Sequence, residues 1–169
     1  FRRVLFRSTD GEKYQADVII TTIPWMEFDE ITGMPEDIKS SIHELKFSSI
    51  QTEYFSENLN TQCQWIYYPD PKLSYHRILV RHNFCPNSRG YWTETNSERI
   101  SMEEPNNNFK YMNQYAYPLN TVKKPEIMKK LLLWSKEKGV IGLGRWGEHQ
   151  HYNSDVTVDL AMKLTQELK

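Results

Sequence analysis

A continuous apolar run at residues 17–23 constrains the fold of this chain more than any other feature. It reads Asp-Val-Ile-Ile-Thr-Thr-Ile and ends at Pro24. The run is too short for a helix, and it lacks the alternation of apolar and polar residues that marks a strand with one face in water. It therefore predicts a buried strand that is covered on both faces, as strands of parallel sheets are.

Helical patterns flank a long extended region. Helices are predicted at residues 35–45 and 125–138, because each segment has proline in its first turn and spaces apolar residues along one face. A third helix is predicted to begin near Ser154 or Asp155, which are both good N-caps. Its apolar stripe would consist of Val156, Leu160, Leu164 and Leu168. Extended segments separated by turn formers are predicted at residues 12–15, 47–55, 64–68, 75–82, 91–95, 109–115 and 139–143.

These patterns predict an α+β fold, in which an antiparallel sheet with flanking helices is followed by a C-terminal strand–turn–helix segment. Residues 9–45 would hold the strand at residues 17–23 and the first helix. Residues 46–120 would form the antiparallel sheet, and residues 121–169 the C-terminal segment. Residues 1–8 match the translation of a common sequencing adapter, which predicts an assembly scar and a native sequence that begins in mid-gene. A genuine edge strand with alternating basic residues is the alternative. The only linker-like stretch is residues 103–108.

Composition argues against several classes of function. The formal charge is -1, with acidic and basic residues interspersed, so no basic field is present to bind nucleic-acid phosphates. No apolar run approaches the roughly 20 residues that a membrane helix needs. Cys63 and Cys85 lie in different segments, without metal-ligand spacing or a secretory leader. We therefore expect a reduced, cytoplasmic compartment.

The segment at residues 142–155 carries the strongest sign of chemistry. It runs from a strand through a turn that contains Gly142, Gly144 and Gly147 into the last helix. Glycines let the backbone approach a ligand closely, Arg145 supplies a positive fork, and the helix start presents unpaired N–H groups. The structural interpretation is that the glycines merely form a tight loop and that Arg145 pairs with a surface acid.

This segment resembles the C-terminal flavin-binding signature of UDP-galactopyranose mutases, in which Gly-Arg is followed by a tyrosine and then by Asn/Asp-x-Asp opening a helix. The resemblance implies FAD as cofactor, in its reduced form for activity. It implies that Gly144 and Arg145 contact the flavin and that Asn153 and Ser154 lie at the helix start against the isoalloxazine. Asp155 would cap the helix. Such a helix start would stabilise the negative charge of reduced flavin.

The resemblance extends back through most of the chain and implies a nucleotide-sugar substrate. Residues 64–69, Gln-Trp-Ile-Tyr-Tyr-Pro, are similar to a mutase motif whose tyrosine lies at the nucleotide sugar, and Tyr67 matches it. Residues 74–77, Ser-Tyr-His-Arg, are similar to a segment whose arginine binds the substrate pyrophosphate, which implies that role for Arg77. Residues 115–118, Tyr-Ala-Tyr-Pro, imply a further pyrophosphate contact from Tyr117.

One position departs from the family pattern. The family has a phosphate-contacting tyrosine six residues after the flavin arginine, whereas this chain has His151. Histidine can still donate to phosphate, so His151 stays a candidate for substrate binding. A metal site at His149 and His151 is disfavoured because no third ligand has sensible spacing, and a surface pair is expected instead.

Aromatic residues of the sheet have a simpler interpretation as core. We expect Trp65, Trp92 and Tyr91 to fill the interior.

No Gly-x-Gly-x-x-Gly occurs in the chain, so the dinucleotide-binding half of a Rossmann-like FAD domain is expected to be missing. The resemblance implies that the full-length parent is an enzyme in which N5 of reduced FAD attacks the anomeric carbon of UDP-galactopyranose, after which the ring reopens and recloses as the furanose. No side chain of this chain need be the nucleophile. The isolated chain is expected to be inactive and to bind FAD weakly or not at all.

Two other functions stay open at this point. An amine-oxidase-like or protoporphyrinogen-oxidase-like oxidation would keep FAD, and His151 in place of tyrosine keeps it open, whereas Arg77 argues against it. A cofactor-free carbohydrate-binding module with an aromatic face is the third interpretation. The unpaired strand at residues 17–23 argues against that module, because an exposed apolar strand promotes aggregation.

Overall fold

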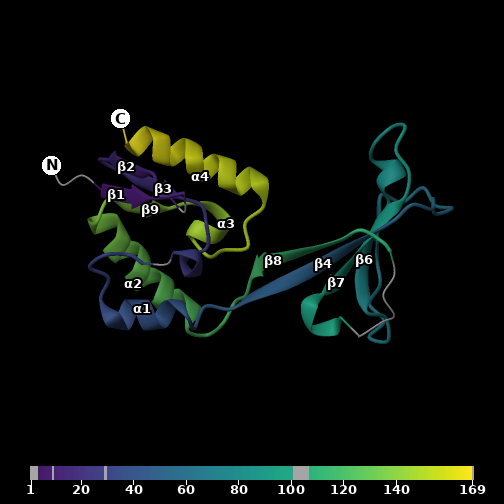
Figure 1. The fold of residues 1–169 in the computed structure, drawn as a ribbon, viewed down its shortest axis with the longest axis horizontal. Helices are drawn as coiled ribbons and strands as arrows, with labels where there is room; N and C mark the ends of the chain where they lie inside the picture. Colours follow the sequence, from purple (N-terminus) through teal and green to yellow (C-terminus); the bar gives the residue numbers. More distant parts are fainter. Residues whose placement is uncertain (1–3, 9, 29, 101–106, 169) are drawn as a thin grey trace. The chain divides into compact units, whose positions relative to one another are not determined.

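The computed structural model describes residues 4–8, 10–28, 30–100 and 107–168 (Figure 1). The chain divides into two compact units, a first unit of Phe1–Lys46 with Pro118–Lys169 and a second unit of Phe47–Tyr117. Together they contain a five-stranded antiparallel sheet, a small parallel pair and four α-helices, so the predicted α+β class is confirmed. Residues 1–3 of the expected scar and residues 103–106 of the expected linker lie outside the described residues.

The first unit contains two small strand pairs. Strand β1 (Val4–Arg7) pairs antiparallel with β2 (Lys13–Ala16), and β3 (Ile19–Thr21) pairs parallel with β9 (Val140–Gly142). The prediction that residues 17–23 form a strand covered on both faces is wrong. Strand β3 is only three residues long, its ladder partner among the described residues is β9, and Ile20 is 46% exposed.

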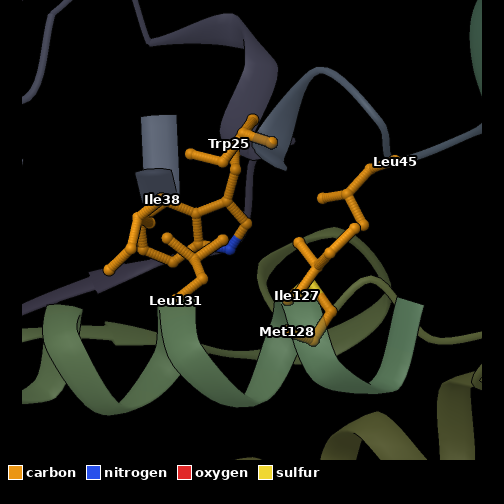
Figure 2. Packing of buried hydrophobic residues seen from close by; sticks show 7 residues of the cluster. Trp25, Ile38, Leu45, Ile127, Met128 and Leu131 are labelled. Carbon is orange, nitrogen blue, oxygen red and sulfur yellow. The ribbon is translucent and has the colours of Figure 1, made fainter. Parts of the chain in front are cut away.

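The hydrophobic core of the first unit lies between two helices and the segment after β3. Helix α1 (Glu36–Ile42) and helix α2 (Lys124–Glu137) lie close to the predicted ranges, because proline opens the first and lies in the opening turn of the second. In Figure 2, side chains of α2 point toward Trp25, which is 2% exposed and lies in the one-turn 3₁₀ helix η1 (Trp25–Glu27). The core residues are Trp25, Ile38, Ile42, Leu45, Ile127, Met128 and Leu131.

The second unit is built around the five-stranded sheet, in the order β5-β6-β7-β4-β8. Its strands agree with the predicted segments, except that β6 stops earlier, before the 3₁₀ helix η2 (Arg81–Asn83), and β8 continues further. The strands are β4 (Phe47–Phe55), β5 (Trp65–Tyr67), β6 (Tyr75–Leu79), β7 (Tyr91–Asn96) and β8 (Lys110–Pro118). A short 3₁₀ helix, η3 (Ser97–Arg99), follows β7.

Two helices close the chain. The one-turn helix α3 (Gly144–Gly147) was not predicted, and α4 (Ser154–Glu167) begins where the sequence indicated. In Figure 1, α4 lies on the opposite side of the β3–β9 pair from α1 and α2. None of its residues is buried, and Val156 and Leu168 of the predicted apolar stripe are exposed. Within the described residues, no helix is long and apolar enough to cross a membrane.

Candidate functional site

The glycine-rich turn packs closely against β3 in the first unit. A Cβ atom on Gly142 would lie 2.2 Å from the carbonyl oxygen of Gly147, and a Cβ atom on Gly147 would lie 2.3 Å from that of Thr21. Trp25 Nε1 also donates to the Gly147 carbonyl oxygen at 2.7 Å. Gly142 and Gly147 are therefore required by backbone packing, as the structural interpretation of the turn expects. Gly144 differs, because its φ of 76° requires a left-handed conformation.

Arg145 is held at the start of the last helix. Its Nη2 and Nε atoms donate to the carbonyl oxygen of Tyr152 at 2.9 and 3.3 Å, across the turn between α3 and α4. Beside it, the Gly144 N–H donates to Glu148 Oε2 at 3.0 Å. Burial raises the pKa of Glu148. The turn thus fixes one guanidinium close to the helix start and makes the neighbouring carboxyl easier to protonate.

Helix α4 begins without a side-chain cap. Its N-cap residue is Asn153, whose side chain makes no capping hydrogen bond. The prediction that Asp155 caps the helix is wrong, because the last extended residue is Asn153 and Asp155 already lies in the first turn. Asn153, Ser154 and Asp155 are all exposed. Since the first N–H groups of a helix have no intrahelical acceptor, this end can donate to the oxygen atoms of a ligand.

A buried lysine and histidine anchor this turn, and neither was predicted to do so. His149 is 1% exposed, so the expectation that it forms a surface pair with His151 is wrong. Its Nε2 lies 3.0 Å from the Lys46 carbonyl oxygen. Lys124, which is 4% exposed, donates to the His149 carbonyl oxygen at 3.0 Å and to two side-chain amide oxygens. Burial lowers the pKa of both Lys124 and His149.

His151 itself is exposed, three residues before the start of α4. The structure therefore places it on the same short connection as Asn153, beside the turn that Arg145 spans. Across the described part of the chain, no three His, Cys, Asp or Glu side chains are grouped so that they could hold a metal ion.

In the second unit, Arg77 makes an ion pair with a carboxylate that the sequence did not reveal. Its Nε donates to Glu94 Oε2 at 2.8 Å, and Nη2 bonds to the same oxygen. The Glu94 side chain is 9% exposed and that of Arg77 is 22% exposed. The two residues are cross-strand partners on β6 and β7, which puts both side chains on one face of the sheet.

Tyr67 and Tyr117 both lie near this guanidinium. Tyr67 is the partner of Arg77 on β5, and its hydroxyl accepts from Arg77 Nη1 at 3.2 Å. Burial works to lower the pKa of Arg77, but the contacts with Tyr67 and Glu94 outweigh it and raise that pKa above its ordinary value. Tyr117 adds to this rise, so it lies within electrostatic reach of the guanidinium. Three residues singled out from separate segments therefore gather in one unit.

The aromatic residues of the sheet are less buried than expected. Trp65 is 52% exposed, so its assignment to the core is wrong. It lies on β5, at one edge of the sheet, where its ring stacks on Phe84 at 5.8 Å. Trp92 and Tyr91 are only half-buried on β7, and each packs against one aromatic ring of β4.

The fold of this chain is similar to parts of known protein structures. The sequence matches no protein-family model and no curated protein sequence. Its structure is similar to that of a reduced UDP-galactopyranose mutase, with a TM-score of 0.66 and 14% identity, covering 85% of this chain and 38% of that one. It is also similar to a protein described as a protoporphyrinogen oxidase from Exiguobacterium sp. 255-15, with a TM-score of 0.53 and 12% identity over 85% of this chain and 39% of that one. The chain thus has the fold of somewhat under half of each protein.

Proposed function

We propose that this chain supplies the substrate-binding sheet and the flavin-facing C-terminal segment of an FAD-dependent enzyme that interconverts the pyranose and furanose forms of UDP-galactose. The observation that carries the proposal is the hydrogen bond between Arg77 and Tyr67, in the same compact unit as Tyr117. These residues come from three separate segments, each chosen for its resemblance to a mutase motif. Similarity of fold to a UDP-galactopyranose mutase supports the same assignment.

The Arg77 side chain is already held in a position from which it can bind a pyrophosphate. A guanidinium has five N–H donors, and the contacts with Glu94 and Tyr67 use three of them. The two remaining donors, one on each Nη atom, can bond to phosphate oxygens without any rearrangement of the side chain. Glu94 therefore orients Arg77, and the cost of ordering the arginine is met before the substrate binds.

Residues of the first unit fit the flavin end of FAD. The α4 N–H groups next to Ser154 lack a side-chain cap, and Arg145 is held beside them by the Tyr152 carbonyl. These groups would hold the electron-rich edge of the ring, and the left-handed Gly144 would let the backbone approach it. When bound, reduced FAD would supply the nucleophile that no side chain of this chain provides.

A dinucleotide-binding half of the same protein is the partner that we propose for the first unit. The apolar residues that remain exposed around β3 and α4 are Val18, Ile20, Ile23, Val156, Val158, Met162 and Leu168. Strands of FAD-binding Rossmann-like domains are covered on both faces. The missing half would therefore bury these side chains and contribute the adenine end of the cofactor site.

An FAD-dependent oxidase is the second candidate, and the Arg77–Glu94 pair favours it. Because Glu94 cancels the formal charge of Arg77, the site is less electropositive than a pyrophosphate site would be with a free arginine. The similarity to the protein described as a protoporphyrinogen oxidase supports the same class of fold.

The full-length parent protein, purified and reduced with dithionite, decides between the two. We expect a flavin absorption spectrum before the reduction and, after it, conversion of UDP-galactopyranose into UDP-galactofuranose, measured by chromatography. Replacing Arg77 with alanine should reduce kcat/KM by roughly 100-fold, because charged hydrogen bonds to the pyrophosphate are lost. Arg89→Ala is the matched control, since Arg89 is exposed in the same unit and its side chain donates to the Ser56 carbonyl oxygen.

Each outcome assigns the protein differently. A flavin spectrum with turnover that depends on Arg77 establishes the mutase. Flavin without turnover, together with consumption of oxygen on addition of an amine or a porphyrinogen, establishes the oxidase. A protein without flavin refutes both proposals.

A further inference from the structure

A cavity lies on the face of the five-stranded sheet opposite Arg77. Its volume is about 300 Å³, at the lower end of the range for small-molecule sites. Successive side chains of a strand point to opposite faces. On β7, Glu94 pairs with Arg77 on one face, whereas Thr93 and Thr95 line the cavity on the other. The cavity is therefore separate from the cluster around Arg77.

Two hydroxyl groups that line the cavity, those of Thr93 and Thr95, make no hydrogen bond within the described residues. Thr93 is 7% exposed and Thr95 is 9% exposed. Both hydroxyls are therefore available to donate to a ligand in the cavity and to accept from it.

The charged groups of the cavity cancel each other. Lys110 Nζ lies 3.8 Å from Glu53 Oε2, and the Asn108 side chain donates to Glu53 Oε1 at 3.0 Å. The Glu53 side chain is only 12% exposed. With one positive and one negative group in contact, the cavity attracts neither anions nor cations, which points to a neutral ligand.

An aromatic wall completes the cavity. The rings of Phe55 and Tyr91 stack with their centroids 4.9 Å apart and their planes 5° from parallel. Both residues line the cavity. Burial, and then the nearby carboxylate of Glu57, raise the pKa of Tyr91, so its hydroxyl remains a donor over a wide pH range. Flat rings next to hydroxyl and amide groups suit a ligand with an apolar C–H face and a polar rim.

From this arrangement we infer that the second unit binds a neutral polyhydroxylated ligand of monosaccharide size in the cavity lined by Thr93, Thr95 and Tyr91. This site lies beyond the proposed function and does not depend on it, because no residue of the Arg77 cluster takes part. The ligand class follows from three features together: two cavity hydroxyls without a hydrogen-bond partner in the described chain, a cancelled charge pair and a stacked aromatic wall.

Saturation-transfer NMR on the full chain tests the inference, with D-glucose, D-galactose and D-mannose as probes in turn. We expect transfer from the protein to the C–H protons of at least one hexose. Thr93→Val preserves the shape of the side chain and removes the hydroxyl, so affinity should fall roughly 3- to 10-fold. Thr93→Ser keeps the hydroxyl and should retain most of the binding. Thr52→Val, on the other face of the sheet, is the control that leaves the cavity intact.

The outcomes separate this site from the proposed one. Hexose binding that survives Arg77→Ala but is weakened by Thr93→Val supports the inference. Absence of transfer to all three hexoses, as expected of a cavity that holds water only, overturns it. Equal binding by the Thr93→Val and unaltered chains also overturns it. UDP binding that is lost in Arg77→Ala and kept in Thr93→Val would support the mutase proposal alone.

Discussion

The second unit brings its charged groups into contact within one sheet, whereas the first unit buries an apolar core on one side of its strands and exposes apolar residues on the other. Arg77 bonds to both Glu94 and Tyr67, so the contacts span three adjacent strands. In the first unit, Leu131 of α2 is fully buried, but Ile20 of β3 is 46% exposed and α4 buries no residue. The second unit therefore contains the contacts that its proposed site needs, whereas the first unit has apolar surface available for a further part of the protein.

Substitution of one glycine in each unit should give the largest effects, about 3 kcal/mol or more of lost stability. A Cβ on Gly147 would lie 2.3 Å from the Thr21 carbonyl oxygen, and one on Gly90 would lie 2.2 Å from the Phe55 carbonyl oxygen. Both obstacles are backbone atoms, which cannot move aside cheaply. Hydrogen exchange should show protection lost mainly in the first unit for Gly147→Ala and mainly in the second for Gly90→Ala.

Gly33→Ala is the control for these variants. Its φ of 78° is also left-handed, but a Cβ there would meet no atom within 4 Å, so the cost should be only about 1 kcal/mol. If either Gly147→Ala or Gly90→Ala removed protection evenly from the whole chain, the two units would not be independently stable.

Removal of the Arg77 charge should destabilise the second unit by about 3 kcal/mol, because it leaves Glu94 nearly buried without its cation. Arg77→Met keeps the length of the side chain, and chemical denaturation measures the loss. The double variant Arg77→Met with Glu94→Gln should regain most of it, since no charge then remains unpaired. A double variant no more stable than Arg77→Met would show that packing, and not charge, holds this part of the sheet.

Periodicity predicted the elements of both units, but not the contacts between elements. Strand β4 and helix α1 agree with their predicted ranges because alternation, proline and turn residues are local signals. The Arg77–Glu94 pair depends on the register of β6 and β7, which are joined by residues that carry no register signal of their own. The sequence offered one hint, a glutamate in the middle of a strand that also contains Trp92, Thr93 and Thr95.

The first unit shows why burial was harder to predict than secondary structure. The apolar run at residues 17–23 correctly indicated a strand, but the described chain leaves one face open, because Thr21 is 5% exposed and the neighbouring Ile20 is 46% exposed. The burial of His149 was not predicted, for a related reason. Its burial depends on Lys46, more than one hundred residues earlier in the sequence, and no local pattern reports that contact.

Acid should weaken the first unit through His149. Burial lowers the pKa of His149 below the 6.5 of an ordinary histidine, and the nearby Lys124 lowers it further. The unfolded chain therefore binds a proton more readily than the folded one, so stability falls as the pH drops from about 6.5 toward the lowered pKa and then levels off. Denaturation between about pH 7 and about pH 5 should show the fall, and it should be smaller in His149→Gln. His151→Gln, at an exposed position, is the control and should keep it.

The smallest effect should come from the exposed apolar residues of the first unit. Ile20→Thr and Val158→Thr remove methyl groups that are 46% and 58% exposed, so the free energy of unfolding should change by no more than about 0.5 kcal/mol. In analytical ultracentrifugation, both variants should stay monomeric at higher protein concentrations than the unaltered chain does, because less apolar surface is available for association. Ile127→Thr, at a residue that is 6% exposed, is the contrasting variant and should cost about 2 kcal/mol.

The same two substitutions, made in the full-length parent, test whether β3 and α4 are covered there. If the proposed dinucleotide-binding half covers β3 and α4, Ile20 and Val158 are buried there, and each change should cost about 1–2 kcal/mol in place of almost nothing. The difference in stability cost between this chain and the full-length parent measures directly how far the proposed half covers these side chains. An equally small cost in both would mean that these side chains stay in water, and that the apolar surface of the first unit is not where the rest of the protein binds.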